Sequence, residues 1–293
     1  MNDKILFILN PISGLRGDKR RKIRKEIIKQ IRIKKLDGEI RYSRYAGHSS
    51  EIAKEAIREE YKYIVVSGGD GSINEVAKEL INTDCALGII PSGSGNGLAH
   101  YLKLPFEIEK CINIIKNKKI QKADVLEING RYVFSIAGIG FDAIVAEKYS
   151  KIKTRGFMAY FNSIVSEYFS FKPEKIKLIT DDHEIETEIF CIVFANSNQF
   201  GYNFKIAPKA NIFDGIIDII LIKPIPLVSA PFSSLRIFSG HADKSLYIDS
   251  FQCKNLKIIR EQDGFINIDG DPIIMNKEIN VKILDGCLNL IVP

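Results

Sequence analysis

The chain has 293 residues, of which 45% are hydrophobic, so it is long enough for one large domain or two ordinary domains with packed cores. Its five cysteines include no Cys-x-x-Cys pair and it has only four histidines, which argues against a zinc site or a disulfide framework and favours a cytoplasmic protein. The longest apolar region, residues 216–238, is interrupted by Asp218, Lys223, Arg236 and three prolines, and the N-terminus lacks the layout of a signal peptide, so no membrane-spanning segment is predicted.

A strongly basic segment follows the first predicted strand, which covers residues 4–9. Residues 16–35 hold eleven lysines or arginines against two acids, while isoleucines recur at positions 23, 27 and 31. This spacing predicts a helix with a narrow apolar stripe and a basic face. Such a face is typical of a solvated surface helix, and it also suits anionic lipid headgroups, where each basic residue contributes ~1 kcal/mol. Nucleic acid ranks last, because no recognised motif or set of stacking aromatics accompanies the charge.

A glycine-rich loop, Gly68-Gly69-Asp70-Gly71, follows the short apolar run at residues 64–66, and a helical pattern begins at Ser72. This strand–turn–helix pattern leaves the backbone N–H groups of residues 69–72 unpaired at the positive end of a helix dipole, which suits phosphate oxygens. The loop matches neither a Walker A loop nor the dinucleotide fingerprint. Asp70 would repel phosphates unless a divalent cation lies between them, so the loop predicts a magnesium nucleotide. An ordinary turn is the alternative.

Two more loops fit the same plan. The predicted strand at residues 86–90 runs into Pro91-Ser92-Gly93-Ser94-Gly95-Asn96-Gly97 and a short helical stretch, and the strand at residues 39–42 runs into Ser43-Arg44-Tyr45-Ala46-Gly47-His48. Ligands bind at the carboxyl ends of strands in open α/β sheets. The loops therefore predict a nucleotide site in an α/β domain with a parallel sheet over residues 1–124.

The character of the chain changes at Asp124, after which short β-rich runs dominate. Turn signals such as Asn129-Gly130 and Asp285-Gly286 separate these runs, and only residues 157–169 and 227–240 favour helices. The pattern predicts an antiparallel sandwich or barrel over residues 125–293, whose last few residues can return to the first domain. The runs cover residues 124–128, 132–137, 175–180, 186–195, 215–222, 245–251, 255–260, 264–268 and 279–283.

Four motifs, taken in order, resemble the diacylglycerol kinase catalytic family, which includes bacterial lipid kinases, sphingosine kinases and ceramide kinases. They are Asn-Pro-x-Ser-Gly at 10–14, Ser-x-x-x-Gly-His at 43–48, Gly-Gly-Asp-Gly-Ser-x-Asn-Glu at 68–75 and Pro-x-Gly-Ser-Gly-Asn at 91–96. The resemblance implies an NAD-kinase-like nucleotide-binding domain, a β-rich lipid-binding domain and an active site in the cleft between them. It also implies ATP- and Mg²⁺-dependent transfer of the γ-phosphoryl group to a hydroxyl of diacylglycerol or a sphingoid-type lipid.

The nucleotide-binding residues implied by these motifs come from the loops. Ser43 and Ser94 stand where the family usually has threonine, and they keep the hydroxyl. Asp70 acts through Mg²⁺ or orients the acceptor hydroxyl, so it is also a catalytic candidate. Asn74 binds phosphate, ties the loops together or bonds the start of its own helix. The full predicted set is Asn10, Ser43, Gly68, Gly69, Asp70, Gly71, Ser72, Asn74, Gly93, Ser94 and Asn96.

Acidic residues in the second half complete the predicted chemistry. Asp269-Gly270-Asp271 follows a predicted strand, and its glycine gives a turn that can aim both carboxylates at one point, although a solvated turn is an alternative. The resemblance favours catalysis, with Asp271 in the position of the family's glutamate. Phe213-Asp214-Gly215 is similar to a segment that holds a structural Mg²⁺ in some bacterial members, which implies the Asp214 carboxylate and the carbonyls of Asn211 and Ile216. A hairpin turn is the competing interpretation.

Other readings stay open at this point. An NAD kinase shares the Gly-Gly-Asp-Gly loop, but the Asn-Pro-x-Ser-Gly and Pro-x-Gly-Ser-Gly-Asn motifs argue against it. A non-catalytic nucleotide- or lipid-binding regulator would have lost the acids that are present here. The expected partner is a lipid at an anionic membrane surface, visited peripherally, with no nucleic acid, and a homodimer is left open. Gly97 departs from the aspartate of many bacterial diacylglycerol kinases, so the lipid itself is not identified.

Overall fold

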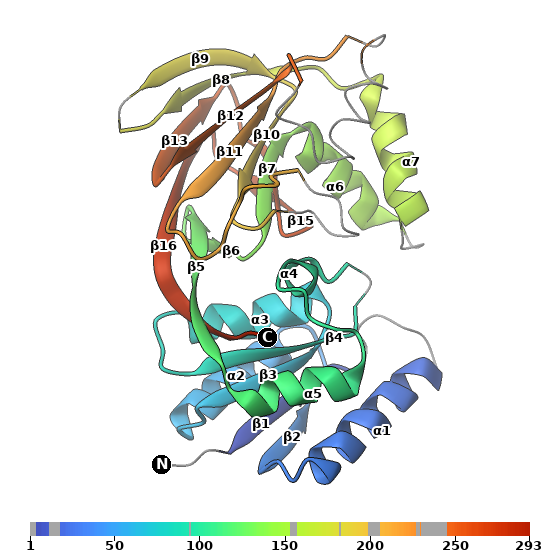
Figure 1. Cartoon of the computed structure of the whole chain (residues 1–293). Coiled ribbons are helices and arrows are strands. Elements are labelled where there is room, and N and C mark those ends of the chain that lie inside the picture. The colour runs from blue at the N-terminus through green and yellow to red at the C-terminus, as the bar shows by residue number, and fades with distance from the viewer. Residues whose placement is uncertain are drawn as a thin grey trace. The chain divides into compact units, whose positions relative to one another are not determined.

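The computed structural model describes residues 4–11, 18–93, 95–152, 157–181, 183–198, 206–226, 229 and 245–293. Ser13, Gly14 and Ser94 lie outside these ranges, as does all of the helix predicted over residues 227–240 except residue 229. The chain forms two compact units (Figure 1). The first contains Met1–Ala123 and Gly286–Pro293, and the second contains Asp124–Asp285.

A parallel sheet forms the first unit, with its strands in the order β2, β1, β3, β4. Its strands are largely buried apolar runs, as expected of a parallel sheet that helices cover on both faces. The strands are β1 (Ile5–Leu9), β2 (Gly38–Tyr42), β3 (Tyr63–Gly68) and β4 (Ala86–Pro91). Leu9 pairs with Tyr42 and Ser67, and Gly68 pairs with Pro91. The loops that follow these strands therefore leave the sheet at one edge, and the predicted α/β fold is confirmed.

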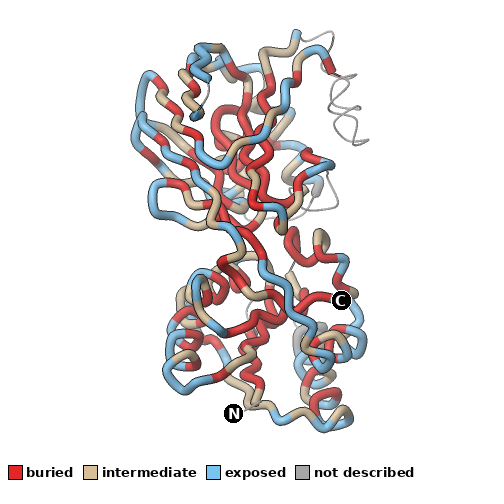
Figure 2. Tube along the Cα trace, turned by 60° about the vertical axis from the view of Figure 1, so that its left-hand side comes forward, coloured by how far each residue is buried: buried red, intermediate tan, exposed pale blue. Residues whose placement is uncertain are grey.

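The helices of this unit bury one face each against the sheet. α1 buries Ile27 and Ile31 in the same cluster as β1 and α5, so the apolar stripe predicted on this basic helix is its packed face. α2 and α3 pack together and bury small and branched side chains. Figure 2 shows how buried and exposed stretches follow one another along the chain in each unit. The helices are α1 (Asp18–Ile33), α2 (His48–Arg58), α3 (Asp70–Leu80), α4 (Gly97–Tyr101) and α5 (Ile108–Asn117).

Antiparallel strands dominate the second unit. One sheet has the order β12, β11, β10, β7, β14, β15. In the other, β16, β13, β8 and β9 are neighbours, and β5 pairs with β16 and β6. The strands are β5 (Ile120–Ile128), β6 (Arg131–Val133), β7 (Ile136–Gly140), β8 (Glu174–Ile179), β9 (Glu184–Ile189), β10 (Cys191–Ala195), β11 (Ile217–Ile222), β12 (Ile248–Cys253), β13 (Asn255–Arg260), β14 (Gly264–Ile268), β15 (Asp271–Met275) and β16 (Glu278–Ile291). The predicted β-rich sandwich is confirmed.

The second unit has two apolar layers. Alternate residues of β10 divide between them: Ile192 and Phe194 face the core between the sheets, whereas Val193 packs under the helices α6 (Phe141–Lys151) and α7 (Phe157–Tyr168). This alternation follows from the two-residue repeat of a strand. The six-stranded sheet is thus covered on both faces, which explains why β10 is uniformly apolar and why β10 and β11 are buried along their whole length. Among the helices described in either unit, none is long and apolar enough to cross a membrane.

Several elements differ from the sequence predictions. The runs predicted over residues 132–137 and 186–195 are each divided between two strands, and β16 continues through the turn predicted at Asp285-Gly286. A helix, α6, follows Gly140, where no helix was predicted, and Gly140 has a φ of +85° at this change from strand to helix. β15 was not predicted. Its Pro272 lacks an N–H group, which is tolerated because β15 is an edge strand among the described residues of its sheet.

The last strand, β16, belongs to both units. Residues 278–282 pair antiparallel with β13, and Asn289 and Leu290 pair parallel with β4. The final residues of the chain therefore add a strand to the first sheet.

Candidate active site

Four predicted nucleotide loops meet at the carboxyl edge of the first sheet. The N–H of Asn10, after β1, donates to the carbonyl of Ser67 at 3.0 Å, and the N–H of Ser43, after β2, donates to the carbonyl of Leu9 at 3.1 Å. The N–H of Ser92, after β4, donates to the carbonyl of Gly68 at 2.9 Å. Residues from four separate motifs are thus brought to one place by the strand register.

The first loop is tied to the start of α3. Asn10 donates through Nδ2 to the Ser72 hydroxyl at 2.7 Å, and Ser72 is buried in the first turn of that helix. Asn74 lies half-buried one turn along the same helix. Ser43 is buried, 3% exposed. The structure therefore places these four predicted residues around one helix end or directly beside its sheet.

Two glycines bring the loop after β3 and the loop after β4 into backbone contact. A Cβ atom on Gly93 would lie 2.4 Å from the Cα of Gly69, and a Cβ on Gly69 would lie 3.1 Å from the Cα of Gly93. No side chain fits at that approach without a shift of the backbone. Gly71 differs, because it is exposed and a Cβ there would meet no protein atom within 4 Å. The fold itself therefore requires glycine at 69 and 93 but not at 71.

Asp70 links the two loops through its carboxylate. Its oxygens accept the backbone N–H groups of Asn96 and Gly97, both at 2.7 Å. Burial raises the pKa of Asp70, and the N–H groups of Gly97 and Asn96 act in the opposite direction. Asp70 therefore holds the start of α4 against α3. The predicted contacts with Mg²⁺ or with an acceptor hydroxyl stay predictions.

Asn96 organises its own loop. Its Oδ1 accepts the N–H of Gly93 at 2.9 Å, and its Nδ2 donates to the Gly93 carbonyl at 2.8 Å. Its φ is +53°, a left-handed conformation that asparagine adopts more readily than most residues. The described contacts of Asn96 thus give it a structural function in the loop where nucleotide contact was predicted.

Glu75 is a site residue to which the sequence pattern assigned no function, although it ends the Gly-Gly-Asp-Gly motif. Its Oε1 accepts the N–H of Gly47 at 2.8 Å, and Gly47 has a φ of +87°. The second and third motifs are therefore tied together at the start of α2. Only the proximity of the two motifs in space reveals the partner.

The acids of the second unit lie on a hairpin. Asp269 and Gly270, with φ values of +51° and +96°, form a two-residue turn that pairs Ile268 with Asp271. The Asp269 carboxylate accepts three backbone N–H groups, from Phe134 at 2.9 Å, Ser135 at 2.8 Å and Ile136 at 3.1 Å. Asp271, the first residue of β15, is exposed. The two acids flank the same turn, but Asp269 is half-buried and accepts backbone N–H groups, whereas Asp271 is exposed to solvent.

The predicted magnesium segment is a turn held by its own side chains. Asn211 Oδ1 accepts the N–H of Phe213 and Asp214 Oδ1 accepts the N–H of Ile216, both at 3.2 Å. Asp214 is exposed, and the described residues contain no cluster of three acids, histidines or cysteines that could hold a metal ion. The donor set fits the competing turn interpretation, and Mg²⁺ at Asn211, Asp214 and Ile216 stays a prediction.

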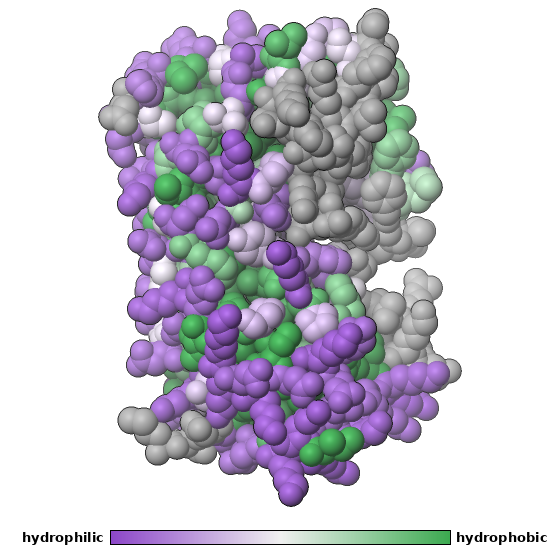
Figure 3. Space-filling model, in the orientation of Figure 1, coloured by the Kyte–Doolittle hydropathy of each residue, from purple (hydrophilic) through white to green (hydrophobic). Residues whose placement is uncertain are grey.

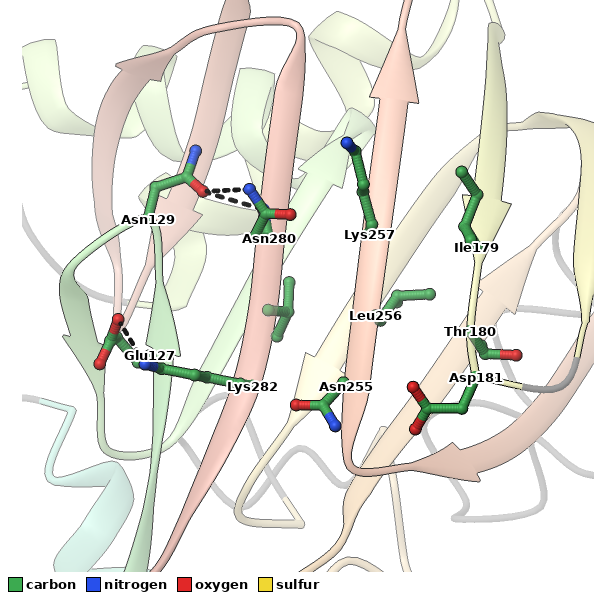
Figure 4. A pocket seen from close by; sticks show the side chains of 11 residues that line it. Glu127, Asn129, Ile179, Thr180, Asp181, Asn255, Leu256, Lys257, Asn280 and Lys282 are labelled. Atoms are coloured by element: carbon green, nitrogen blue, oxygen red, sulfur yellow. Dashed lines mark hydrogen bonds and ion pairs between the residues drawn. The ribbon is translucent and has the colours of Figure 1, made fainter.

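A further hollow lies over the sheet of the second unit, away from every predicted site residue (Figure 4). Strands β5, β8, β13 and β16 line it. Its two lysines are paired with acids, Lys282 with Glu127 at 3.2 Å and Lys257 with Glu278 at 2.8 Å. No group there is arranged for chemistry.

Comparisons with known proteins agree with this geometry. Residues 4–128 match the diacylglycerol kinase catalytic domain, and residues 135–292 match the YegS C-terminal NAD kinase beta sandwich-like domain. The chain is 29% identical over 231 residues to a diacylglycerol kinase of Bacillus subtilis (strain 168), covering 77% of this chain and 76% of that protein. It is 27% identical over 276 residues to a "probable lipid kinase YegS-like" of Yersinia pestis (strain Pestoides F), covering 92% of each.

Solved structures show the same fold. A diacylglycerol kinase from Bacillus anthracis str. Sterne superposes with a TM-score of 0.79 at 21% identity, covering 99% of this chain and 97% of that one. The motif loops, the hairpin acids and the two matching domains agree on one assignment. The chain therefore belongs to the diacylglycerol kinase family and is a lipid kinase with a C-terminal domain of the YegS type.

Proposed function

We propose that the protein transfers the γ-phosphoryl group of ATP to a hydroxyl of a membrane lipid, either diacylglycerol or a sphingoid-type lipid. The observation that carries the proposal is the edge of the first sheet, where Asn10, Gly69 and Gly93 interlock beside the start of α3. The first N–H groups of a helix have no partner within the helix and attract phosphate. The exposed Gly71 leaves room for backbone approach at that point.

Mg²⁺ would accompany ATP as its counter-ion, because phosphoryl transfer needs its charge neutralised and its groups held in line. The acceptor oxygen bonds to the γ-phosphorus, ADP leaves, and the hydroxyl proton passes to a base. Asp271 fits the base better than Asp269, since Asp269 already accepts three N–H groups whereas Asp271 is exposed at the end of the hairpin.

Engagement of a membrane surface is the second part of the proposal. One face of α7 packs Tyr160 and Ile164 on the core. The other carries three large apolar side chains spaced three to four residues apart, Met158 (66% exposed), Phe161 (40%) and Val165 (45%), and Phe169 (73%) follows directly after the helix. Figure 3 shows hydrophobic side chains along the edge where α7 lies. Such an uncharged apolar face suits the interface of a bilayer.

The basic face of α1 supplies the charge that anionic headgroups would attract. Arg21, Arg24 and Lys25 are exposed on it, and hydrophilic side chains dominate this part of the first unit in Figure 3. The basic face of α1 and the apolar face of α7 would contribute to membrane binding by different forces. Salt weakens only the electrostatic contribution, because screening limits the range of charge interactions to ~8 Å at physiological ionic strength.

The test is incubation of the full chain with labelled ATP, Mg²⁺ and single lipid alcohols, with NAD as a control acceptor. We expect label in a lipid phosphate from diacylglycerol or a sphingoid base, and no label when a chelator removes Mg²⁺. Label on NAD alone, or on no lipid alcohol, would contradict the proposal.

A further inference from the structure

A buried acid lies beside the hairpin turn and has no part in the proposed chemistry. Asp142, in the first turn of α6, is 7% exposed, and its Oδ2 accepts a hydrogen bond from Nδ2 of Asn267 at 2.8 Å. Asn267 is 4% exposed and accepts the N–H of Gly270 through Oδ1 at 2.9 Å. Asn267 therefore bridges a buried carboxylate and the turn that carries Asp269 and Asp271.

The strand before α6 is shaped to hold this carboxylate. A Cβ on Gly138 would lie 2.4 Å from Oδ2 of Asp142, so glycine makes room for the acid. Gly140, with a φ of +85°, turns β7 into α6, and a Cβ there would lie 2.7 Å from the Phe190 carbonyl. The Gly-x-Gly-x-Asp pattern thus builds an enclosed place for one carboxylate.

The ionised carboxylate selects one orientation of the Asn267 amide. A carboxylate only accepts hydrogen bonds, and the N–H of Gly270 only donates. The amide satisfies both neighbours when Nδ2 faces Asp142 and Oδ1 faces Gly270, whereas the flipped amide would oppose acceptor to acceptor and donor to donor. A protonated acid, or an asparagine at 142, can donate and would therefore remove the opposition at residue 142, so that only the Gly270 N–H still selects the orientation of the amide.

We propose that Asp142 is a positioning residue, which acts through Asn267 to fix the Asp269-Gly270 turn and so to place Asp271 for phosphoryl transfer. The catalytic part of this inference rests on the proposed lipid kinase activity. The positioning part does not, because it concerns the hairpin of the second unit alone.

Protonation of Asp142 would weaken the selection of one orientation of the Asn267 amide. Burial raises the pKa of Asp142 to about 6, although the hydrogen bond from Asn267 opposes the shift. The titratable groups that interact electrostatically with Asp142 are Cys191 of β10 and Tyr160 of α7. The exposed Asp271 lies on β15, which α6 also contacts. Burial raises the pKa of Cys191 and of Tyr160 well above their ordinary values, so both stay neutral where Asp142 titrates.

The structural test is an amide NMR titration of the full chain between pH 4.5 and 8, in steps of about 0.5 pH unit around the shifted pKa. In the wild type we expect the Gly270 N–H and the Asn267 side-chain NH₂ resonances to shift together, with an apparent pKa near 6. In Asp142→Asn these shifts should be absent. Glu174→Gln is the matched control, because it removes another carboxyl whose pKa burial raises but which lies on β8, and it should leave the titration unchanged.

The kinetic test is a charge swap. Asp142→Asn and Asn267→Asp should each lower kcat about 10- to 100-fold, because misplacement of a reacting group by ~1 Å costs about that much. The double variant Asp142→Asn/Asn267→Asp keeps one carboxylate, one amide and both hydrogen bonds. The bond between residues 142 and 267 is reversed, and the Gly270 N–H still donates to residue 267, so the variant should recover most of the turnover. KM for ATP should stay unchanged in all three, since the nucleotide loops belong to the first unit.

Either of two results would by itself overturn the inference, and a third is given by the double variant: hairpin resonances that do not titrate near pH 6 in the wild type, or single variants with wild-type kcat. A double variant that folds but is no better than the singles would also overturn it. If the wild type phosphorylates no lipid alcohol, the proposed function fails, and the NMR titration still decides whether Asp142 controls the turn.

Discussion

Asp269 and Asp271 lie two positions apart and are expected to fail in different ways when their charge is removed. Asp269→Asn suits the left-handed backbone at this position but loses a carboxylate that accepts three N–H groups, so we expect a loss of about 2 kcal/mol in the free energy of unfolding. Asp271→Asn should leave stability unchanged and lower turnover by ~10²–10⁴-fold, as removal of a general base does.

Urea unfolding and steady-state kinetics on both variants check this contrast. Asp271→Glu is the matched control, since it restores the commoner family residue and should keep much of the activity. An active Asp271→Asn enzyme beside an inactive but fully stable Asp269→Asn enzyme would transfer the assignment of the base to Asp269.

Asp142 predicts an unusual pH dependence of stability. Its pKa is raised from 3.8 to about 6 by burial, so folding favours the protonated form. Its contribution is fully present below pH ~3.8 and is lost as the pH rises through about 6. Asp142→Asn is therefore expected to raise the free energy of unfolding at pH 8 by up to about 3 kcal/mol. Urea unfolding at pH 8 and pH 4 should show the gain shrink at the lower pH, and a variant less stable than wild type at pH 8 would refute this.

Two glycines of the phosphate loops are expected to be needed for different reasons, Gly93 for the fold and Gly71 for nucleotide binding. Gly71→Val places its Cβ in open space, so the protein should fold normally and lose Mg-ATP binding, because only the nucleotide competes for that space. Gly93→Val, which collides with Gly69, should instead lower the melting temperature. Isothermal titration with Mg-ATP and circular dichroism distinguish the two, and wild-type ATP affinity in a folded Gly71→Val protein would rule out the loop assignment.

The sequence predicted where these residues lie but not which of them hold the loops together and which are available to a ligand. The order of glycine, serine and asparagine in four motifs predicted one loop cluster, because parallel strands deliver their ends to one edge. The partners of Asp70 and Asn96 come from another loop or a local turn, so they depend on three-dimensional contacts that spacing does not encode. Asp142 was left without a function for the same reason, since Asn267 is far from it in sequence.

The helices α1 and α7 are expected to contribute to membrane binding by separable forces. Phe161→Ser with Val165→Ser removes exposed apolar area, and burying each such side chain in a bilayer contributes about 1–2 kcal/mol. Vesicle binding should therefore fall at all salt concentrations. Arg21→Glu with Lys25→Glu should abolish only the part that salt weakens.

Sedimentation with anionic and neutral vesicles checks this pair, with Asn162→Ala and Ser166→Ala as exposed controls on α7. Both apolar and charge variants should keep activity on lipid dispersed in detergent. Equal losses in vesicles and detergent would mean that these helices are needed for the fold instead.

Helices and strands were predicted correctly where their apolar residues follow a simple pattern, either a helical spacing or a continuous run. The apolar stripe of α1 and the uniform runs of β1, β3 and β4 were legible, because each faces one continuous core. The prediction of elements failed where a single residue started a helix inside an apolar run, or where an edge position allowed a residue that is rare in strands. Gly140 starts α6 within an apolar run, and Pro272 is compatible with a strand because β15 is an edge strand among the strands that the structure describes.

The two units share the last strand, which makes the end of the chain part of the nucleotide-binding fold. Leu288, Leu290 and Ile291 are each at most 2% exposed, and Asn289 donates through Nδ2 to the carbonyl of Thr83 at 3.0 Å. Burial of each apolar side chain stabilises by about 2 kcal/mol. Against a typical total of 5–15 kcal/mol, deletion of residues 286–293 should remove most of the first unit's stability.

We therefore expect this deletion to abolish Mg-ATP binding although none of the deleted residues belongs to the nucleotide motifs. Circular dichroism and calorimetry should show loss of the helix-rich transition, while the β-rich signal of the second unit persists. Removal of Pro293 alone, which is exposed, is the matched control and should change neither. If the shortened chain binds Mg-ATP with wild-type affinity, the parallel pairing of β16 with β4 is dispensable, and the four-stranded sheet of β1 to β4 is enough to hold the phosphate loops in place.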